Sequence, residues 1–144
     1  MLRAVLDTSV LVSSVLVPNG VPARLLDAWR AQRFVLVTSP PLLAELKSTL
    51  SYPRLRRKYP ITDAQVDRLA DALAGQGHLV AGKADVSRSG IRDANDEIIL
   101  ACAVDGEADV IVSSDLDLLT LRSYREIPIL NPREMLAHLE ERYP

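Results

Sequence analysis

The sequence predicts an α/β fold with a mostly parallel central sheet and helices on both of its faces. Short apolar runs rich in β-branched residues, at 3–6, 34–38 and 110–112, alternate with longer segments whose apolar residues recur at helical spacing. This alternation implies right-handed crossovers, which cover both faces of a parallel sheet. The 144 residues, of which 48% are hydrophobic, suffice for one core and hardly for two, and no linker divides them. We expect a single domain over residues 1–144.

The first half of the chain is expected to hold two strands and four helices. Residues 3–6 form a strand, and the oxygen-bearing side chains of Asp7-Thr8-Ser9 can cap a helix over 10–17. A turn at Pro18-Asn19-Gly20 precedes a helix over 21–30, and a strand follows at 34–38. Ser39-Pro40-Pro41 opens a helix that Tyr52-Pro53 breaks. A basic connection over 54–58 then leads to a helix that Thr62-Asp63 caps and that reaches 75–77.

The second half continues the same alternation. Residues 78–81 predict a short strand and 82–90 a loop. The acidic segment Asp93-Ala94-Asn95-Asp96-Glu97 begins a buried helix, which ends at Gly106. A strand over 110–112 meets Ser113-Ser114-Asp115, and a last strand at 127–130 precedes a helix that begins at Pro132.

Composition excludes several classes of function. Lys and Arg number 17 against 19 Asp and Glu, for a net charge of -2, so a uniformly basic nucleic-acid coat is excluded. The single Cys102 can form neither an internal disulfide nor a cysteine-rich zinc cage, which suits a reducing cytosol. No apolar run approaches the roughly 20 residues that span a bilayer, and Asp7 comes too early for a signal peptide. We expect a soluble cytoplasmic protein with no membrane partner.

Acidic side chains are predicted to gather at one edge of the sheet. Asp7 and Asp115 follow the two clearest apolar strands, and the carboxyl ends of parallel strands share one edge. The helix that begins near Asp96 leads directly into the Asp115 strand, so its N-terminus is expected at the same edge. Clustered carboxylates repel one another unless a cation neutralises them, and hard divalent ions prefer oxygen ligands. The pattern therefore predicts a site for Mg²⁺ or Mn²⁺ that suits phosphodiester cleavage.

Four segments together resemble the PIN-domain ribonucleases. They are Leu6-Asp7-Thr8-Ser9, Glu45 within an apolar helix, the run from Asp93 to Ala103, and the run from Ala108 to Leu119. The resemblance covers nearly the whole chain, and it is nearest to the VapC-like toxins of toxin–antitoxin pairs. The chain has Ser9 where this family often has Asn, and Ser113-Ser114 where a Thr and Gly pair often precedes the acid.

The resemblance implies a metal-dependent endoribonuclease that uses Mg²⁺ or Mn²⁺ and leaves a 5′-phosphate and a 3′-hydroxyl. Its acidic centre corresponds to Asp7, Glu45, Asp96 and Asp115. Asp7, Asp96 and Asp115 are expected to hold the metal, and Glu45 to complete the cage or orient the attacking water. Neighbouring groups would support these ligands, or in the case of the acids hold a second metal: Asp93, Asp117, Ser9 and Ser114. Such proteins commonly form homodimers and are held inactive by a small antitoxin protein.

A basic segment is predicted to bind RNA, which the acidic metal site would repel. Its cations are Arg54, Arg56, Arg57 and Lys58, and they are flanked by Tyr52 and Tyr59. Such groups bind phosphates and stack on bases, although a solvated turn has the same composition. The apolar residues Leu11, Val15, Leu25 and Trp29 fit either the core or a dimer surface.

Simpler interpretations exist for each residue alone. Asp7 and Asp117 can cap helices or turns, Asp93 and Asp96 can complement a helix dipole, and Glu45 can extend to solvent. His78, His138 and Cys102 have no partner motif. A haloacid dehalogenase-type phosphotransferase usually has a second Asp at the position of Ser9, and no glycine-rich phosphate loop follows the first strand. The remaining alternative is a catalytically inactive PIN fold that acts as an RNA-binding or scaffold protein.

Overall fold

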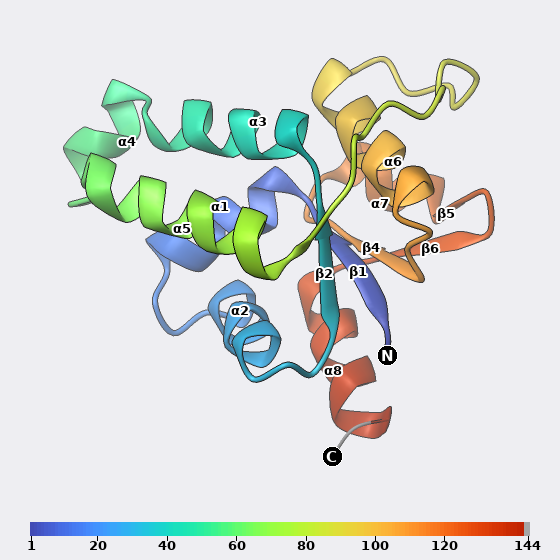
Figure 1. Cartoon of the computed structure of the whole chain (residues 1–144), viewed down its shortest axis with the longest axis horizontal. Helices are drawn as coiled ribbons and strands as arrows, with labels where there is room; N and C mark the ends of the chain where they lie inside the picture. The colour runs from blue at the N-terminus through green and yellow to red at the C-terminus, as the bar shows by residue number, and fades with distance from the viewer. Residues whose placement is uncertain (143–144) are drawn as a thin grey trace.

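A six-stranded sheet forms the centre of the computed structural model, which describes residues 1–142 (Figure 1). Its order is β3-β2-β1-β4-β6-β5, and all neighbouring pairs are parallel except β5 with β6. The strands are β1 (Arg3–Leu6), β2 (Val35–Thr38), β3 (His78–Leu79), β4 (Val110–Val112), β5 (Ser123–Tyr124) and β6 (Ile127–Leu130). The predicted α/β class and mostly parallel sheet are confirmed.

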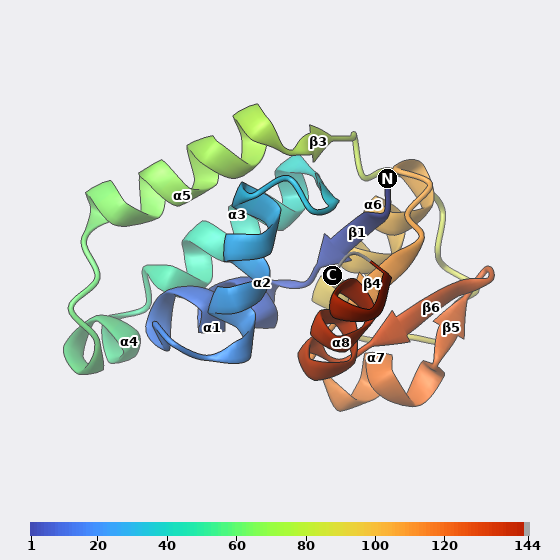
Figure 2. The ribbon, with the colours of Figure 1, turned by 90° about the horizontal axis from the view of Figure 1, so that it is seen from below.

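Helices cover both faces of the sheet (Figures 1 and 2). Figure 2 shows α8 on the near face of β1 and β4, with α6 behind these strands, and α2 packs against α8. Helices α3 and α5 pack together beside β2, and α3 also contacts α1 and α6. The bounds are α1 (Thr8–Leu16), α2 (Val21–Arg30), α3 (Pro40–Leu50), α4 (Pro53–Lys58), α5 (Asp63–Gln76), α6 (Ala94–Asp105), α7 (Leu116–Leu121) and α8 (Pro132–Arg142).

The strand order creates a switch point between β1 and β4. From β1 the chain crosses to β2 on one side, whereas β4 pairs with β1 on the other, with Leu6 opposite Val112. The Asp7 amide extends this pairing by donating to the Val112 carbonyl at 3.0 Å. In open parallel sheets, ligands bind outside the carboxyl ends of strands at such a point. The fold therefore places its natural binding crevice beside Asp7 and the residues after β4.

Side-chain caps fix where the helices around this crevice begin. Asp7 caps α1 by accepting from the Val10 amide, and Asp93 caps α6 by accepting from Asn95. Asp115 likewise caps α7 by accepting from Asp117. A cap satisfies backbone donors that the first helical turn leaves free. The capping interpretation of Asp7 is thus confirmed, and it is compatible with a place in the crevice.

The core explains most of the early apolar residues. Leu11 and Leu25 are fully buried within the single chain, and Trp29 is nearly so. These side chains are therefore core residues and not a dimer surface, whereas Val15 is only partly buried. Within residues 1–142, no single helix is long and apolar enough to cross a membrane; α1 and α2 pass that test only as a pair bent by 98°.

Three short elements differ from the sequence-based expectation. The basic connection over 54–58 forms α4, because Pro53 at its first position suits a helix start even without an apolar stripe. The turn expected after Asp117 is α7, whose Leu118 is fully buried. Strand β5 forms a small antiparallel edge with β6, and two residues are too few for a periodic signal.

Candidate metal centre

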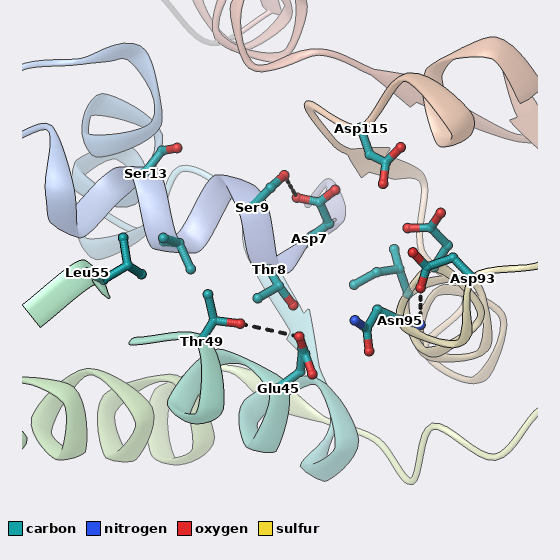
Figure 3. A pocket seen from close by; sticks show the side chains of 13 residues that line it. Asp7, Thr8, Ser9, Ser13, Glu45, Thr49, Leu55, Asp93, Asn95 and Asp115 are labelled. Carbon is teal, nitrogen blue, oxygen red and sulfur yellow. Dashed lines mark hydrogen bonds between the residues drawn. The ribbon is translucent and has the colours of Figure 1, made fainter. Parts of the chain in front are cut away.

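The crevice between β1 and β4 is a cleft of about 470 Å³. Its walls come from α1, the α3–α4 region, the start of α6 and the segment after β4 (Figure 3). We call it the central cleft, and it is lined by Asp7, Thr8, Ser9, Val12, Ser13, Glu45, Thr49, Leu55, Asp93, Asn95, Asp96, Ile99 and Asp115. Residues distant in sequence but predicted to form one acidic site thus line one cleft.

Asp7 is held rigidly at the floor of the cleft. Its Oδ1 accepts hydrogen bonds from the Ser9 hydroxyl at 2.6 Å and from the Val10 amide at 3.0 Å. Its Oδ2 accepts from the hydroxyl of Ser113. Burial raises the pKa of Asp7, these hydrogen bonds oppose that effect, and the like charge of Asp115 adds to it. The carboxylate is therefore fixed in orientation and electrostatically linked to Asp115.

The tightest group of carboxylates consists of Asp96, Asp115 and Asp117. One oxygen from each lies within 4.8 Å of the others, which is the arrangement that a single ion can bridge. Asp96 comes from α6, whereas Asp115 and Asp117 come from the turn after β4 and the first turn of α7. Asp117 is thus a member of the cluster itself, whereas the family resemblance implies for it a supporting place or a second metal.

Asp96 is the most perturbed acid of this group. The side chain is 5% exposed, and its Oδ2 is buried without a hydrogen-bond partner. Burial is the largest cause that raises the pKa of Asp96, and with the like charges of Asp115 and Asp93 the pKa reaches about 7. A buried carboxylate oxygen without a partner is costly unless something positive binds it. These residues fit a hard divalent cation, whose preferred ligands are carboxylate oxygens.

Glu45 faces the acids from the α3 side of the cleft (Figure 3). The side chain is half-buried, and its Oε1 accepts a hydrogen bond from the Thr49 hydroxyl at 3.3 Å. Thr49 lies one helical turn after Glu45, so α3 supplies both the acid and the group that orients it. Asp93 lies at the α6 end of the cleft (Figure 3), where it caps that helix and is exposed.

Comparison with known families agrees with this geometry. A family model of the PIN domain matches residues 3–117, which include every acid of the central cleft and Asp117. The chain belongs to the PIN-domain family. This PIN domain is also 26% identical to the uncharacterized protein MJ1680 of Methanocaldococcus jannaschii, over 97% of this chain and 93% of that protein.

Solved structures show the same fold at low sequence identity. A chain of VapBC2 from Rickettsia felis, bound to a DNA fragment from its promoter, is 16% identical with a TM-score of 0.62. That alignment covers 90% of this PIN domain and 98% of the VapBC2 chain. A chain of FitAcB from Neisseria gonorrhoeae is 18% identical with a TM-score of 0.54, over 90% of this chain and 98% of that one.

The basic segment over residues 54–58 forms most of α4, at the rim of the cleft. Leu55 of α4 lines the cleft, which places the helix at the end opposite Asp93 (Figure 3). Arg56 is half-buried and bonded to the rest of the fold, because it donates to the Leu50 carbonyl at 2.8 Å and to Asp63 at 2.9 Å. Three cations of α4 are exposed: Arg54, Arg57 and Lys58.

The two serines after β4 have different positions from those expected. Ser114 is exposed and lines another hollow, between α2, α7 and the start of α8. The buried Ser113 instead donates to Asp7 and accepts from the Asp115 amide at 2.9 Å. Ser113 therefore joins the two strand ends. The sequence signal for Ser113 is its place directly after β4. Successive side chains of a strand point to opposite faces of the sheet, so Ser113 and Ser114 must point in different directions.

Proposed function

We propose that this PIN domain is a metal-dependent endoribonuclease that hydrolyses RNA phosphodiester bonds. The observation that carries the proposal is the convergence of acids from several elements, with the carboxylates of Asp96, Asp115 and Asp117 within 4.8 Å and Asp96 Oδ2 buried without a partner. Burial and the neighbouring like charges raise the pKa of Asp96, which is costly to the fold, and perturbed groups of this kind gather at functional sites. Membership of the PIN-domain family supports the same reading.

Asp96, Asp115 and Asp117 would hold Mg²⁺ or Mn²⁺, with Asp7 as a further ligand directly or through water. Such an ion stabilises charge on a phosphate oxygen and lowers the pKa of a coordinated water. Ser9 and Ser113 orient Asp7 by hydrogen bonds, and Asp93 lies within reach of the same charge. The network keeps the carboxylates in place before substrate arrives, which reduces reorganisation during reaction.

Glu45 would orient the attacking water and accept its proton. The hydrogen bond from Thr49 holds this carboxylate on α3, on the wall that faces Asp7 and Ser9 (Figure 3). The water oxygen would form a bond to phosphorus while the bond from phosphorus to the 3′ oxygen breaks, and the 3′ oxygen would take up a proton from solvent water. The products are a 5′-phosphate and a 3′-hydroxyl, so the RNA 2′-hydroxyl is not needed as nucleophile.

The exposed cations of α4 would bind the RNA backbone beside the cleft. Arg54, Arg57 and Lys58 provide this charge, whereas Arg56 holds α4 against α5 through Asp63. Attractive charge at the rim is required because the acids of the cleft repel nucleic acid.

We further propose that the protein is the toxin of a toxin–antitoxin pair, inhibited by a small antitoxin protein and active as a homodimer in the cytoplasm. The similar structures belong to the VapBC2 and FitAB complexes, which supports a protein partner. The buried, unpaired Cys102 suits a reducing compartment. Co-expression with the product of a small neighbouring gene, followed by purification, tests for such a partner.

The test of the nuclease is cleavage of a mixed cellular RNA pool by the purified protein with Mg²⁺, Mn²⁺ or EDTA. Asp96→Asn removes one carboxylate from the cluster, and Asp71→Asn removes an exposed acid of α5 as a matched control. We expect metal-dependent cleavage that Asp96→Asn abolishes and Asp71→Asn retains. Undiminished cleavage by folded Asp96→Asn would refute the site. RNA binding without cleavage under every condition would instead support an inactive RNA-binding PIN fold.

A further inference from the structure

A second hollow of about 450 Å³ adjoins the central cleft. It lies between the segment that precedes α6 and one face of α7, and Asp93 lines both spaces. Asp117, a member of the tight carboxylate group, also lines it. We call it the Arg92 hollow, and its lining consists of residues 89–93 with Asp117, Thr120 and Leu121. The two spaces therefore meet at the candidate metal centre.

The lining of the Arg92 hollow has the mixed chemistry that a nucleotide requires. Arg92 is exposed and carries a planar guanidinium, the group best suited to bidentate contact with a phosphate. Thr120 adds a hydroxyl that can donate to a phosphate or a ribose oxygen. Ile91 and Leu121 are half-buried and supply apolar walls.

The segment that carries Arg92 is fastened to the rest of the fold. The Arg125 guanidinium donates to the Asp85 carbonyl at 2.7 Å, which ties the segment to the turn between β5 and β6. The Ile91 amide donates to the Ser89 hydroxyl at 3.1 Å. Gly90 has a φ of +82°, a backbone conformation that glycine adopts without strain. Arg92 therefore begins from a defined backbone position.

The Arg92 hollow and α4 lie at opposite ends of the central cleft, and this arrangement indicates the kind of ligand that the hollow binds. In Figure 3, Leu55 of α4 and Asp93 lie at opposite ends of the central cleft. Exposed cations thus flank the acidic centre on two sides, with α4 at one end and Arg92 beyond the other. A strand whose scissile phosphate lies at the carboxylates would have to continue past both ends.

We propose that the Arg92 hollow binds single-stranded RNA at a nucleotide adjacent to the scissile bond, with Arg92 on its backbone phosphate. The inference rests on the proposed nuclease function and specifies how the substrate crosses the site. Asp93 lines both spaces and Asp117 belongs to the tight carboxylate group, so Arg92 would hold a phosphate next to the scissile one. Arg92 is a positioning residue, because it holds the strand in place and takes no part in the chemical step.

The test is RNA binding under conditions that do not require cleavage. Binding of a fluorescein-labelled, mixed-sequence single-stranded RNA is followed by anisotropy with Ca²⁺ in place of Mg²⁺, at several salt concentrations. Arg92→Gln removes the charge, and Arg88→Gln removes an exposed arginine of the same segment that does not line the hollow. We expect Arg92→Gln to weaken binding about fivefold and to reduce the salt slope by about 0.7, the value for one phosphate on a single strand.

The outcomes separate this inference from the proposed function. Arg88→Gln should change the affinity less than twofold, and both variants should melt at the temperature of the unchanged protein. Equal affinity and salt slope for Arg92→Gln and Arg88→Gln would overturn the inference even if the protein cleaves RNA. Tight binding that depends on Arg92, without cleavage in Mg²⁺ or Mn²⁺, would support the hollow and contradict the nuclease. No RNA binding by the unchanged protein would overturn the inference, and cleavage with Mg²⁺ or Mn²⁺ would decide the nuclease function separately.

Discussion

The substitution Asp96→Asn should stabilise the protein in the absence of metal, although it removes the proposed activity. Asn keeps the shape of the side chain and removes the charge that burial and the neighbouring acids oppose. The pKa of Asp96 rises from 3.8 to about 7, and each unit corresponds to about 1.4 kcal/mol, which sets a ceiling of about 4 kcal/mol. Because solvent screens the exposed Asp93 and Asp117, we expect a gain of about 2 kcal/mol.

The dependence of this gain on pH follows from linkage. The folded protein binds the Asp96 proton more tightly than the unfolded chain does, so this group favours folding below its unfolded pKa of 3.8. That contribution is lost as the pH rises through about 7. The advantage of Asp96→Asn over the unchanged protein should therefore be absent near pH 4 and complete near pH 8.

The assay is thermal or urea unfolding in EDTA and in excess Mg²⁺. In EDTA at pH 8 we expect Asp96→Asn to melt roughly 6–8 °C above the unchanged protein. An ion present at about 100 times its dissociation constant stabilises the native state by about 2.7 kcal/mol, so Mg²⁺ should reverse this order. Asp71→Asn is the control, since this exposed acid of α5 lies outside the cleft. A stability in EDTA equal to that of the unchanged protein, or an advantage that persists at pH 4, would show that the charge of Asp96 does not destabilise the fold.

Three further predictions concern metal affinity, the support of Asp7 and the role of α4. Protons compete with the ion for Asp96, so the apparent affinity for Mn²⁺, followed by calorimetry, should fall up to tenfold per pH unit below about 7 and level off above it. Ser113→Ala removes the hydrogen bond to Asp7 Oδ2 and should lower the free energy of unfolding by about 1–3 kcal/mol, measured in urea. Arg56→Ala should destabilise the protein measurably, whereas Arg57→Ala should leave stability unchanged and weaken RNA binding, because only Arg56 is bonded within the fold.

Each of these has a result that would count against it. An Mn²⁺ affinity that is flat between pH 5 and pH 8 would show that Asp96 does not hold the ion. Ser113→Ala should exceed Ser114→Ala in its effect, and equal effects would contradict the assignment of Ser113 as the support of Asp7. Equal loss of stability in Arg56→Ala and Arg57→Ala would contradict the division of roles on α4.

The fold was largely predictable because its signals are local and repeated. Short apolar runs rich in β-branched residues predict β1, β2 and β4. The capping residues that follow these strands predict where the next helices begin. Parallel topology then forces the ends of β1 and β4 to one edge, which is why Asp7 and Asp115 could be placed together from sequence. Helix α6 leads into β4, so the start of the helix, which carries Asp96, also lies at this edge.

The details that sequence could not supply depend on tertiary packing. Helix α7 is six residues long and holds Leu118 in the core, and this short packed turn brings Asp117 to Asp96 and Asp115. Which of Ser113 and Ser114 faces Asp7 depends on the register of β4 at its last residue. The pairing of Arg56 with Asp63 depends on how α4 and α5 meet, and no pattern along the chain specifies that.

The most direct test of the account is a crystal structure of the protein with Mn²⁺, with anomalous diffraction measured above and below the manganese absorption edge. We predict an anomalous peak at coordination distance from Asp96 Oδ2 and from the carboxylates of Asp115 and Asp117, and no peak there in crystals of Asp96→Asn. An empty acidic cleft at saturating Mn²⁺, or a peak that Asp96→Asn leaves unchanged, would contradict the proposal that these carboxylates form the metal centre.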